Sequence, residues 1–261
     1  MIRHMRKPFV SLISNEHFQL GCTGQTVYVL NAAGNELAKF KDMIYAYSAA
    51  LHPNGEVAAV YSNHGIMAIY SLSELRLITK FRVSAVKDTA TDRIPCFSLD
   101  GKHLFHIEGR TGDALNTRLS IYSTADYKQV TRLFEQGQKT VFSCIESGQD
   151  GCIYLLGYFR KENRNEFFVS KLAGQILQDV RPLDEHIYDF YRNAVHLKQE
   201  GFTELSFKWS QFITKPKIKR ELEQAFGQPV DFGPFNHEYT LDEIKRMNPS
   251  LAQCWEENYR S

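Results

Sequence analysis

Short runs of alternating apolar and polar residues recur along the chain, each bounded by a polar turn. Such alternation is typical of half-buried β-strands, because successive side chains on a strand point to opposite faces. The runs fall into four groups of four, which predicts four four-stranded units. They are residues 9–13, 18–22, 26–30 and 36–40; 47–51, 57–61, 66–70 and 75–81; 94–98, 103–107, 119–123 and 130–134; and 141–145, 152–157, 166–170 and 175–180.

The turns between first and second strands repeat a short polar pair that ends in glycine. Glycine supplies the positive φ that a tight turn requires. The glycines Gly55, Gly101, Gly151 and Gly201 lie 46, 50 and 50 residues apart. An earlier copy of the turn, at residues 14–17, lacks the glycine. A period of about 40–50 residues carrying strand-like segments is the pattern of β-propeller blades.

Two kinds of matching segment carry a resemblance to a known group of proteins. They are the Pro-Asn-Gly and Leu-Asp-Gly turns at 53–55 and 99–101, and the Ile-Tyr-Ser strands at 69–71 and 121–123. Over roughly residues 8–210 the chain resembles the WD40-like and YVTN-like β-propellers. No Trp-Asp ends a third strand and no Gly-His precedes the blades, so the resemblance implies the architecture without the WD40 hydrogen-bond network. A β-sandwich is the alternative for evenly spaced short strands.

The predicted fold is an all-β propeller of about five four-stranded blades, the fifth incomplete, with a short C-terminal helical tail. The fifth blade begins with strands at 188–197 and 202–209 and then loses the pattern. We therefore predict a β-propeller over residues 1–213 and a helical tail packed on it over residues 214–261. Either residues 3–10 or the tail is expected to cover the open edge of the last blade.

The helical tail is predicted because the spacing of apolar residues changes there from a strand-like to a helix-like period. Ile218, Leu222, Ala225 and Phe226 share one face of a helix, and Gly227 is a C-terminal stop. Helices this short are not stable alone, so they are expected to pack on the propeller or on a partner protein.

Charge and targeting patterns limit the partners and the cellular location that are expected for the protein. The formal net charge is +1, from 31 basic and 30 acidic residues, and no basic stripe is evident, so nucleic acid is not an expected partner. The sequence shows no signal-peptide pattern and no apolar run of membrane-spanning length. Five cysteines without C-x-x-C spacing are typical of a reducing compartment. A cytoplasmic protein is predicted, and its oligomeric state is left open.

Motifs for catalysis, metals and nucleotides are missing from the sequence. It contains no G-x-S-x-G, no H-E-x-x-H and no phosphate-binding glycine loop. His103 and His106 are three residues apart on a predicted strand and therefore face opposite sides. No metal, cofactor or catalytic residue is predicted.

The candidate binding residues come from two loops and one cluster. The segments 108–117 and 159–165 both connect second and third strands, exceed the turns of the first two blades, and are expected on one face of the disc. The acid–histidine cluster at 184–186 enters the fifth blade. The predicted binding residues are Arg110, Asp113, Tyr158, Arg160, Lys161, Arg164, Asp184 and His186.

The absence of chemical motifs on a rigid scaffold with variable loops predicts a non-enzymatic module that binds a protein partner. The alternative is a small-ligand or carbohydrate-binding protein, or a hydrolase, with its site at the central channel. The first strands are mostly apolar or small at segments 48–50, 95–97 and 142–144, which weighs against a polar channel. A third alternative is a small accessory or immunity-type protein of a bacterial operon, which fits the size and the near-neutral charge but is indicated by no particular residue.

Overall fold

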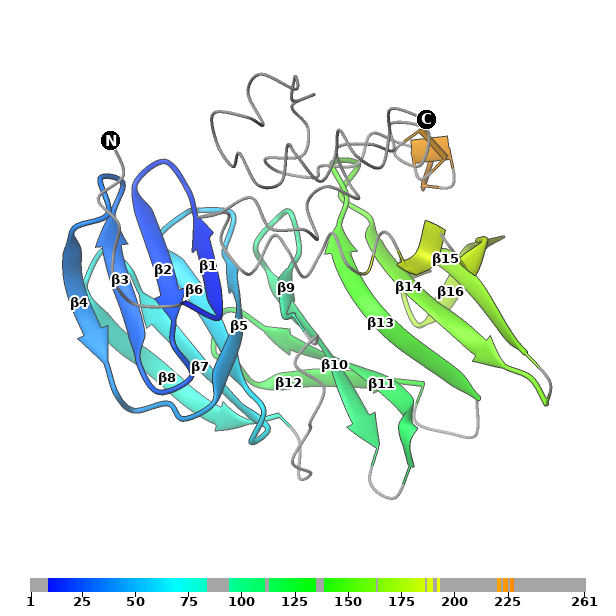
Figure 1. Ribbon diagram of the computed structural model, residues 1–261, viewed down its shortest axis with the longest axis horizontal. Helices are drawn as coiled ribbons and strands as arrows, with labels where there is room; N and C mark the ends of the chain where they lie inside the picture. Colours follow the sequence, from blue (N-terminus) through cyan, green and yellow to red (C-terminus); the bar gives the residue numbers. More distant parts are fainter. Residues whose placement is uncertain are drawn as a thin grey trace, which may run out of the picture.

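Sixteen β-strands form four four-stranded antiparallel sheets in the computed structural model of the protein (Figure 1). The structure describes residues 9–83, 94–110, 113–134, 139–162, 164–185, 187–189, 192, 220–221, 223–224 and 226–227. Each sheet is a meander whose strands pair in chain order, so that each is one propeller blade.

The blades are numbered along the chain. Blade 1 contains β1 (Ser11–Ser14), β2 (Phe18–Cys22), β3 (Val27–Asn31) and β4 (Glu36–Phe40). Blade 2 contains β5 (Ala46–Leu51), β6 (Val57–Ser62), β7 (Ile66–Ser71) and β8 (Arg76–Arg82). Blade 3 contains β9 (Cys96–Phe97), β10 (His103–Arg110), β11 (Asp113–Ser123) and β12 (Gln129–Leu133). Blade 4 contains β13 (Thr140–Ser147), β14 (Ile153–Arg160), β15 (Asn165–Ala173) and β16 (Ile176–Pro182).

The blades are packed face to face around their first strands. β1 contacts β5, β5 contacts β9, and β9 contacts β13, and the sheets fan out from these strands in Figure 1. A separate apolar cluster fills each junction between successive blades. On β6, Val60 packs toward blade 1 and Tyr61 toward blade 3. Because both faces of an inner blade are covered, β6 is buried at five successive positions, 58–62, rather than at alternate ones.

The ends of the blades define two faces of the disc. The linker face carries the second-to-third-strand hairpins and the linkers between blades, and the turn face carries the opposite strand ends. On the linker face, Ala46 N donates to Gly24 O at 3.3 Å, and Phe142 N donates to Thr117 Oγ1 at 2.6 Å. These bonds bring the hairpin of one blade beside the start of the next.

On the turn face, two hydrogen bonds join successive blades; we call them the rim bonds. Asn15 Nδ2 donates to Gly55 O at 2.8 Å, and His52 Nε2 lies 2.8 Å from Gly101 O. His52 Nδ1 accepts the Asn54 N–H at 3.1 Å, which assigns the ring proton to Nε2 as donor. The rim bonds hold the turns of blades 1, 2 and 3 in line.

Glycine at the turn is needed for two reasons at Gly101. Its φ is +71°, a left-handed conformation that side chains rarely adopt. A Cβ added there would also lie 2.5 Å from the His52 ring. The rim bond therefore forms because the His52 ring can approach the Gly101 backbone closely, and it can do so because residue 101 has no side chain.

All sixteen strands predicted for the first four blades are present, and most ends differ from the expected ones by a few residues. The long loop expected at 108–117 is wrong in most of its length, and the one expected at 159–165 is wrong at its ends. β10 and β11 extend to Arg110 and from Asp113, and β14 and β15 extend to Arg160 and from Asn165. The hairpins are therefore long, with short tips.

The predicted fifth blade is wrong at its start. Residues 185, 187–189 and 192 are helical, so the strand expected over 188–197 does not begin there. The remainder of that strand, from residue 193, and the strand expected at 202–209 lie outside the described residues. Within the described residues, no helix is long and apolar enough to cross a membrane.

Helical residues cover the side of blade 4 that faces away from blade 3. The ring of Tyr188 lies 4.4 Å from that of Phe167 and 6.1 Å from that of Tyr158, and the hydroxyls of Tyr188 and Ser143 are hydrogen-bonded. Phe226, in a helical segment that ends at Gly227, lies 5.3 Å from Tyr154. Side chains from beyond the last strand thus bury the aromatic surface of this blade.

Candidate functional site

The linker face at blade 4 gathers most of the predicted binding residues that the structure describes. Tyr158 and Arg160 end β14, and Lys161 and Arg164 form the tip of its hairpin with β15. Asp184 follows β16, which ends at the same face because Leu183 N donates to Phe167 O at 2.9 Å. Asp184 is exposed, and its carbonyl accepts the Ile187 and Tyr188 N–H groups at the start of the helix.

The other three predicted residues are only partly described. Arg110 and Asp113 pair across the tip of the β10–β11 hairpin, which lies on the linker face of blade 3. Their side chains and the whole of His186 lie outside the described residues. The structure therefore brings the two hairpin tips to one face, as the sequence predicts, and leaves the acid–histidine cluster untested.

The hairpin tip of blade 4 is a charged surface. Glu166 lies 3.0 Å from Arg164 Nη2 and 3.6 Å from Lys161 Nζ. The hydrogen bond from Arg164, followed by the charges of Lys161 and Arg164, lowers the pKa of the Glu166 carboxyl. Two exposed cations thus share the Glu166 carboxylate, and residues 160–166 together carry three cations and two acids. Tyr158 lies beneath them, half-buried against Phe167 at 5.6 Å.

A buried carboxylate lies between blades 2 and 3, and sequence reasoning placed it in a solvated loop. Glu108 on β10 is 0% exposed. Arg118 Nε donates to its Oε2 at 2.8 Å, the Ser120 hydroxyl donates to Oε1, and Arg132 Nε lies 3.8 Å away. Burial, followed by the charge of Glu108, raises the pKa of the neighbouring Tyr122 hydroxyl well above its usual range. The two arginines neutralise a carboxylate that would otherwise be too costly to bury.

The histidine beside Glu108 is also buried. His106 is 0% exposed, and its ring lies 4.3 Å from that of Tyr61 on blade 2. His103, three residues earlier, is half-buried and faces the other side of the sheet. Within the described residues, no group of three His, Cys, Asp or Glu side chains is placed to hold a metal ion. His106 and Glu108 lie inside a junction between blades, where they position the blades.

A second surface on the linker face was missed by the sequence reasoning. We call it the Tyr45 surface; it consists of Ile44, Tyr45, Tyr47 and His64. Ile44 and Tyr45, in the linker between β4 and β5, are 52% and 47% exposed. The Tyr45 ring lies 4.5 Å from His64 and 6.3 Å from Tyr47. Two large apolar side chains thus stand adjacent in solvent at the junction of blades 1 and 2.

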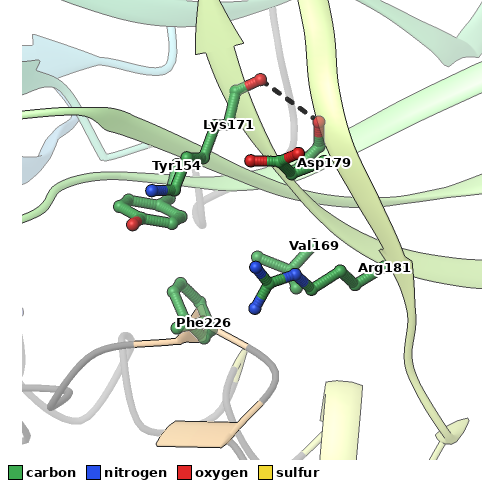
Figure 2. A pocket seen from close by; sticks show the side chains of 7 residues that line it. Tyr154, Val169, Lys171, Asp179, Arg181 and Phe226 are labelled. Carbon is green, nitrogen blue, oxygen red and sulfur yellow. Dashed lines mark hydrogen bonds between the residues drawn. The ribbon is translucent and has the colours of Figure 1, made fainter.

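A small cavity lies where the helical segment ending at Gly227 meets blade 4. Figure 2 shows Tyr154 and Phe226 on one side of it and the Arg181 guanidinium close to Phe226. Lys171 Nζ lies 5.3 Å from the centre of the Tyr154 ring. The cavity volume of about 10 Å³ has room for about one water molecule. It is a packing gap rather than a ligand site.

Comparison with known proteins identifies the architecture. No family model matches the chain and no curated protein is similar to it. Among solved structures, the WD40 domain of Toxoplasma gondii coronin matches at 14% identity and a TM-score of 0.53, covering 68% of this chain and 46% of that one. The structure of U3-55K matches at 10% identity and a TM-score of 0.49, covering 68% and 53%.

The coronin match and the four antiparallel sheets show a WD40-like β-propeller architecture, as the sequence predicts. The chain spans about half the length of the two structures that it matches. At this level of identity the similarity concerns the fold alone.

Proposed function

We propose that the protein is a non-enzymatic interaction module that binds a protein partner through its linker face. The observation that carries this proposal is the unequal distribution of charge between the two faces. The chain as a whole is nearly neutral, with a formal net charge of +1. A neutral protein that separates its charges between two faces presents each face to a different kind of surface.

The turn face is acidic. Its exposed acids include Glu16, Glu56, Glu74, Asp100, Asp126 and Asp150. Its exposed cations pair with the acid two residues earlier: Arg76 with Glu74, Lys102 with Asp100, and Lys128 with Asp126. The cations of this face are therefore locally neutralised, and the acids dominate.

The linker face is basic and carries exposed apolar side chains. Its exposed cations on linkers, hairpin tips and strand ends include Lys41, Lys80, Arg82, Lys139, Lys161 and Arg164. The exposed acids on these segments are slightly fewer: among the described residues they are Asp42, Glu162, Asp184, Glu185 and, in the helical residues after them, Asp189. Aromatic and apolar side chains surrounded by charge are typical of protein-binding surfaces.

Charge reversal on one face at a time tests the proposal. The linker-face variant is Lys161→Glu with Arg164→Glu, and its matched control on the turn face is Lys102→Glu with Lys128→Glu. Partners purified with each full-length variant from cells that produce the protein are quantified by mass spectrometry. We expect the linker-face variant to lose its partners about fivefold or more, while the control retains them.

Two results would overturn the proposal. If both variants recover the same proteins at wild-type levels, binding does not involve the linker face. If a partner is recovered cleaved or otherwise covalently altered only when the wild-type protein is present, the module is not a passive binder.

A further inference from the structure

Among the described residues, five other than glycine adopt a left-handed backbone conformation: Tyr45, Leu75, Tyr127, Phe134 and Asp179. Four of the five carry a bulky side chain. For such residues a positive φ is unfavourable, because Cβ approaches the carbonyl oxygen. The conformation persists only where other interactions hold it.

Three of the four bulky residues offset this strain by packing. Leu75 packs against the apolar cluster between blades 1 and 2. Tyr127 stacks on Phe81 at 6.5 Å, and Phe134 lies 4.9 Å from Phe142 in the cluster between blades 3 and 4. At these positions the left-handed turn directs an apolar side chain into the core.

Tyr45 shows the opposite arrangement. Its φ is 55°, the same as that of Tyr127, yet its side chain is 47% exposed. The linker around it is held by the Asn63 N–H, which donates to Tyr45 O at 3.1 Å, and by the Ser62 hydroxyl, which donates to Ile44 O at 2.6 Å. The fold therefore maintains a strained backbone whose effect is to present an aromatic ring to solvent.

Cations lie beside this surface. Lys80 Nζ donates to Asp42 O at 3.1 Å, Arg82 Nη1 donates to His64 O at 3.3 Å, and Lys41 is exposed in the same linker. These three cations outnumber the Asp42 carboxylate, which accepts the Tyr70 hydroxyl at 3.1 Å. A ligand for this surface needs an apolar group for Ile44 and Tyr45 and negative charge for the cations.

We infer that the Tyr45 surface binds an acidic protein segment that inserts an aromatic or aliphatic side chain between Ile44 and Tyr45. The inference rests on the proposed function and locates its principal contact at the junction of blades 1 and 2. Tyrosine is enriched at such contacts because it buries a large area while losing little conformational freedom.

A phage-displayed library of random peptides of about 12 residues, selected on the full-length protein, supplies the probe. Selected peptides are expected to carry Asp or Glu beside an aromatic or aliphatic residue. Fluorescence anisotropy then measures their affinity for wild type, Tyr45→Gly and the matched control Tyr127→Gly. We expect Tyr45→Gly to weaken binding about tenfold or more and Tyr127→Gly to leave it unchanged.

Thermal unfolding separates loss of contact from loss of fold. Glycine removes the backbone strain at both positions, but Tyr127 packs against the buried cluster between blades 2 and 3, whereas the Tyr45 ring contacts the partly exposed His64 and Tyr47 at the surface. We expect the Tm of Tyr45→Gly to stay within about 3 °C of wild type and that of Tyr127→Gly to fall by about 6 °C or more. Lys41→Glu is expected to weaken peptide binding about threefold or more.

Each contrary result has a distinct meaning. Peptides that bind wild type and Tyr45→Gly equally, but lose affinity for Lys161→Glu with Arg164→Glu, overturn this inference and leave the proposed function standing. Selection of basic peptides, or of none, overturns the acidic partner. Concentration-dependent dimerisation of the wild type that Tyr45→Gly abolishes would replace the acidic segment with a second copy of the chain.

Discussion

The junction between blades 2 and 3 and the junction between blades 3 and 4 differ in the polar groups that accompany their apolar clusters. Blades 2 and 3 are joined by the His52 rim bond on the turn face and meet around Glu108, which is buried among Arg118, Ser120 and Arg132. Blades 3 and 4 meet through aromatic rings: Phe142 lies 4.9 Å from Phe134 and 6.3 Å from Phe168.

The turn of each blade shows the same contrast. The position that begins the turn holds Asn15, His52, Ser98 and Gly148 in blades 1 to 4. Asn15 and His52 reach the next blade, but the Ser98 hydroxyl bonds to Asp100 within its own turn at 2.7 Å. On the turn face a hydrogen bond therefore joins blade 2 to blade 3, whereas the bond from Phe142 N to Thr117 Oγ1 joins blades 3 and 4 on the linker face, beside their apolar cluster.

The largest effect is expected for Phe142→Ala. Phe142 is 2% exposed, and its truncation removes packing from both sides of the junction between blades 3 and 4. The free energy of unfolding should fall by about 4 kcal/mol, measured by urea denaturation. Phe142→Leu, which keeps most of the volume, is the control and should lose about half as much. A loss below about 1 kcal/mol would show that aromatic packing does not hold blade 4.

Glu108→Gln tests the polar junction. The change leaves the Arg118 and Arg132 guanidinium groups without their shared buried carboxylate, and we expect the free energy of unfolding to fall by about 3 kcal/mol. The same denaturation experiment on Glu166→Gln is the control and should show little change, because its partners Lys161 and Arg164 are solvent-exposed. Equal effects of the two variants would mean that burial of the network has no importance.

A pair of glycine substitutions separates the rim bond from backbone conformation. Gly101 and Gly151 have similar φ values, +71° and +77°, but a Cβ at Gly151 meets no described atom within 4 Å. Gly151→Ala should therefore lower the free energy of unfolding by about 1 kcal/mol, and Gly101→Ala by about 2 kcal/mol. His52→Ala should remove the difference between them, since the clash and the rim bond both disappear.

The smallest effect concerns pH and the turn of blade 4. Burial alone would raise the pKa of the Asp150 carboxyl, but hydrogen bonds from the Cys152 N–H, the Tyr154 hydroxyl and Lys171 lower it to about 2. Because the folded-state pKa lies below the unfolded value, its stabilisation is present above about pH 4 and is lost as the pH falls toward 2. The Tm of the wild type should fall more steeply over this range than that of Asp150→Asn. If the Tm of the wild type and that of Asp150→Asn fall equally with pH, the low pKa of the Asp150 carboxyl is refuted.

The sequence predicts the strands well because two local signals coincide. Alternation of period two marks each strand, and the glycine turns fix where each blade begins. The error at 108–117 has a specific cause: Glu108 reads as a polar loop residue, yet it is buried on its strand, where it pairs with Arg118 and Ser120 of the next strand. Mutual neutralisation of charged side chains depends on the strand register, which the sequence pattern does not reveal.

The candidate site was predicted in part for a similar reason. The hairpin tips at Arg110 and Arg160 share a face because strand order places all second-to-third-strand connections there. Tyr45 was missed because a left-handed tyrosine has no sequence signature, whereas a glycine at the same φ has one. The helical residues 185, 187–189 and 192 were missed because the pattern assigns Tyr188 to a strand, whereas its ring packs on Phe167.

The rim bonds also have a direction. In each, the side chain that donates belongs to the earlier blade, and the glycine carbonyl that accepts belongs to the next one. A chain leaves the ribosome from its N-terminus, and its early parts fold first. The turn of blade 1 therefore already presents Asn15 when Gly55 emerges, and the turn of blade 2 presents His52 to Gly101. Blades 1 and 2 each therefore offer a docking point to the blade that is synthesised next.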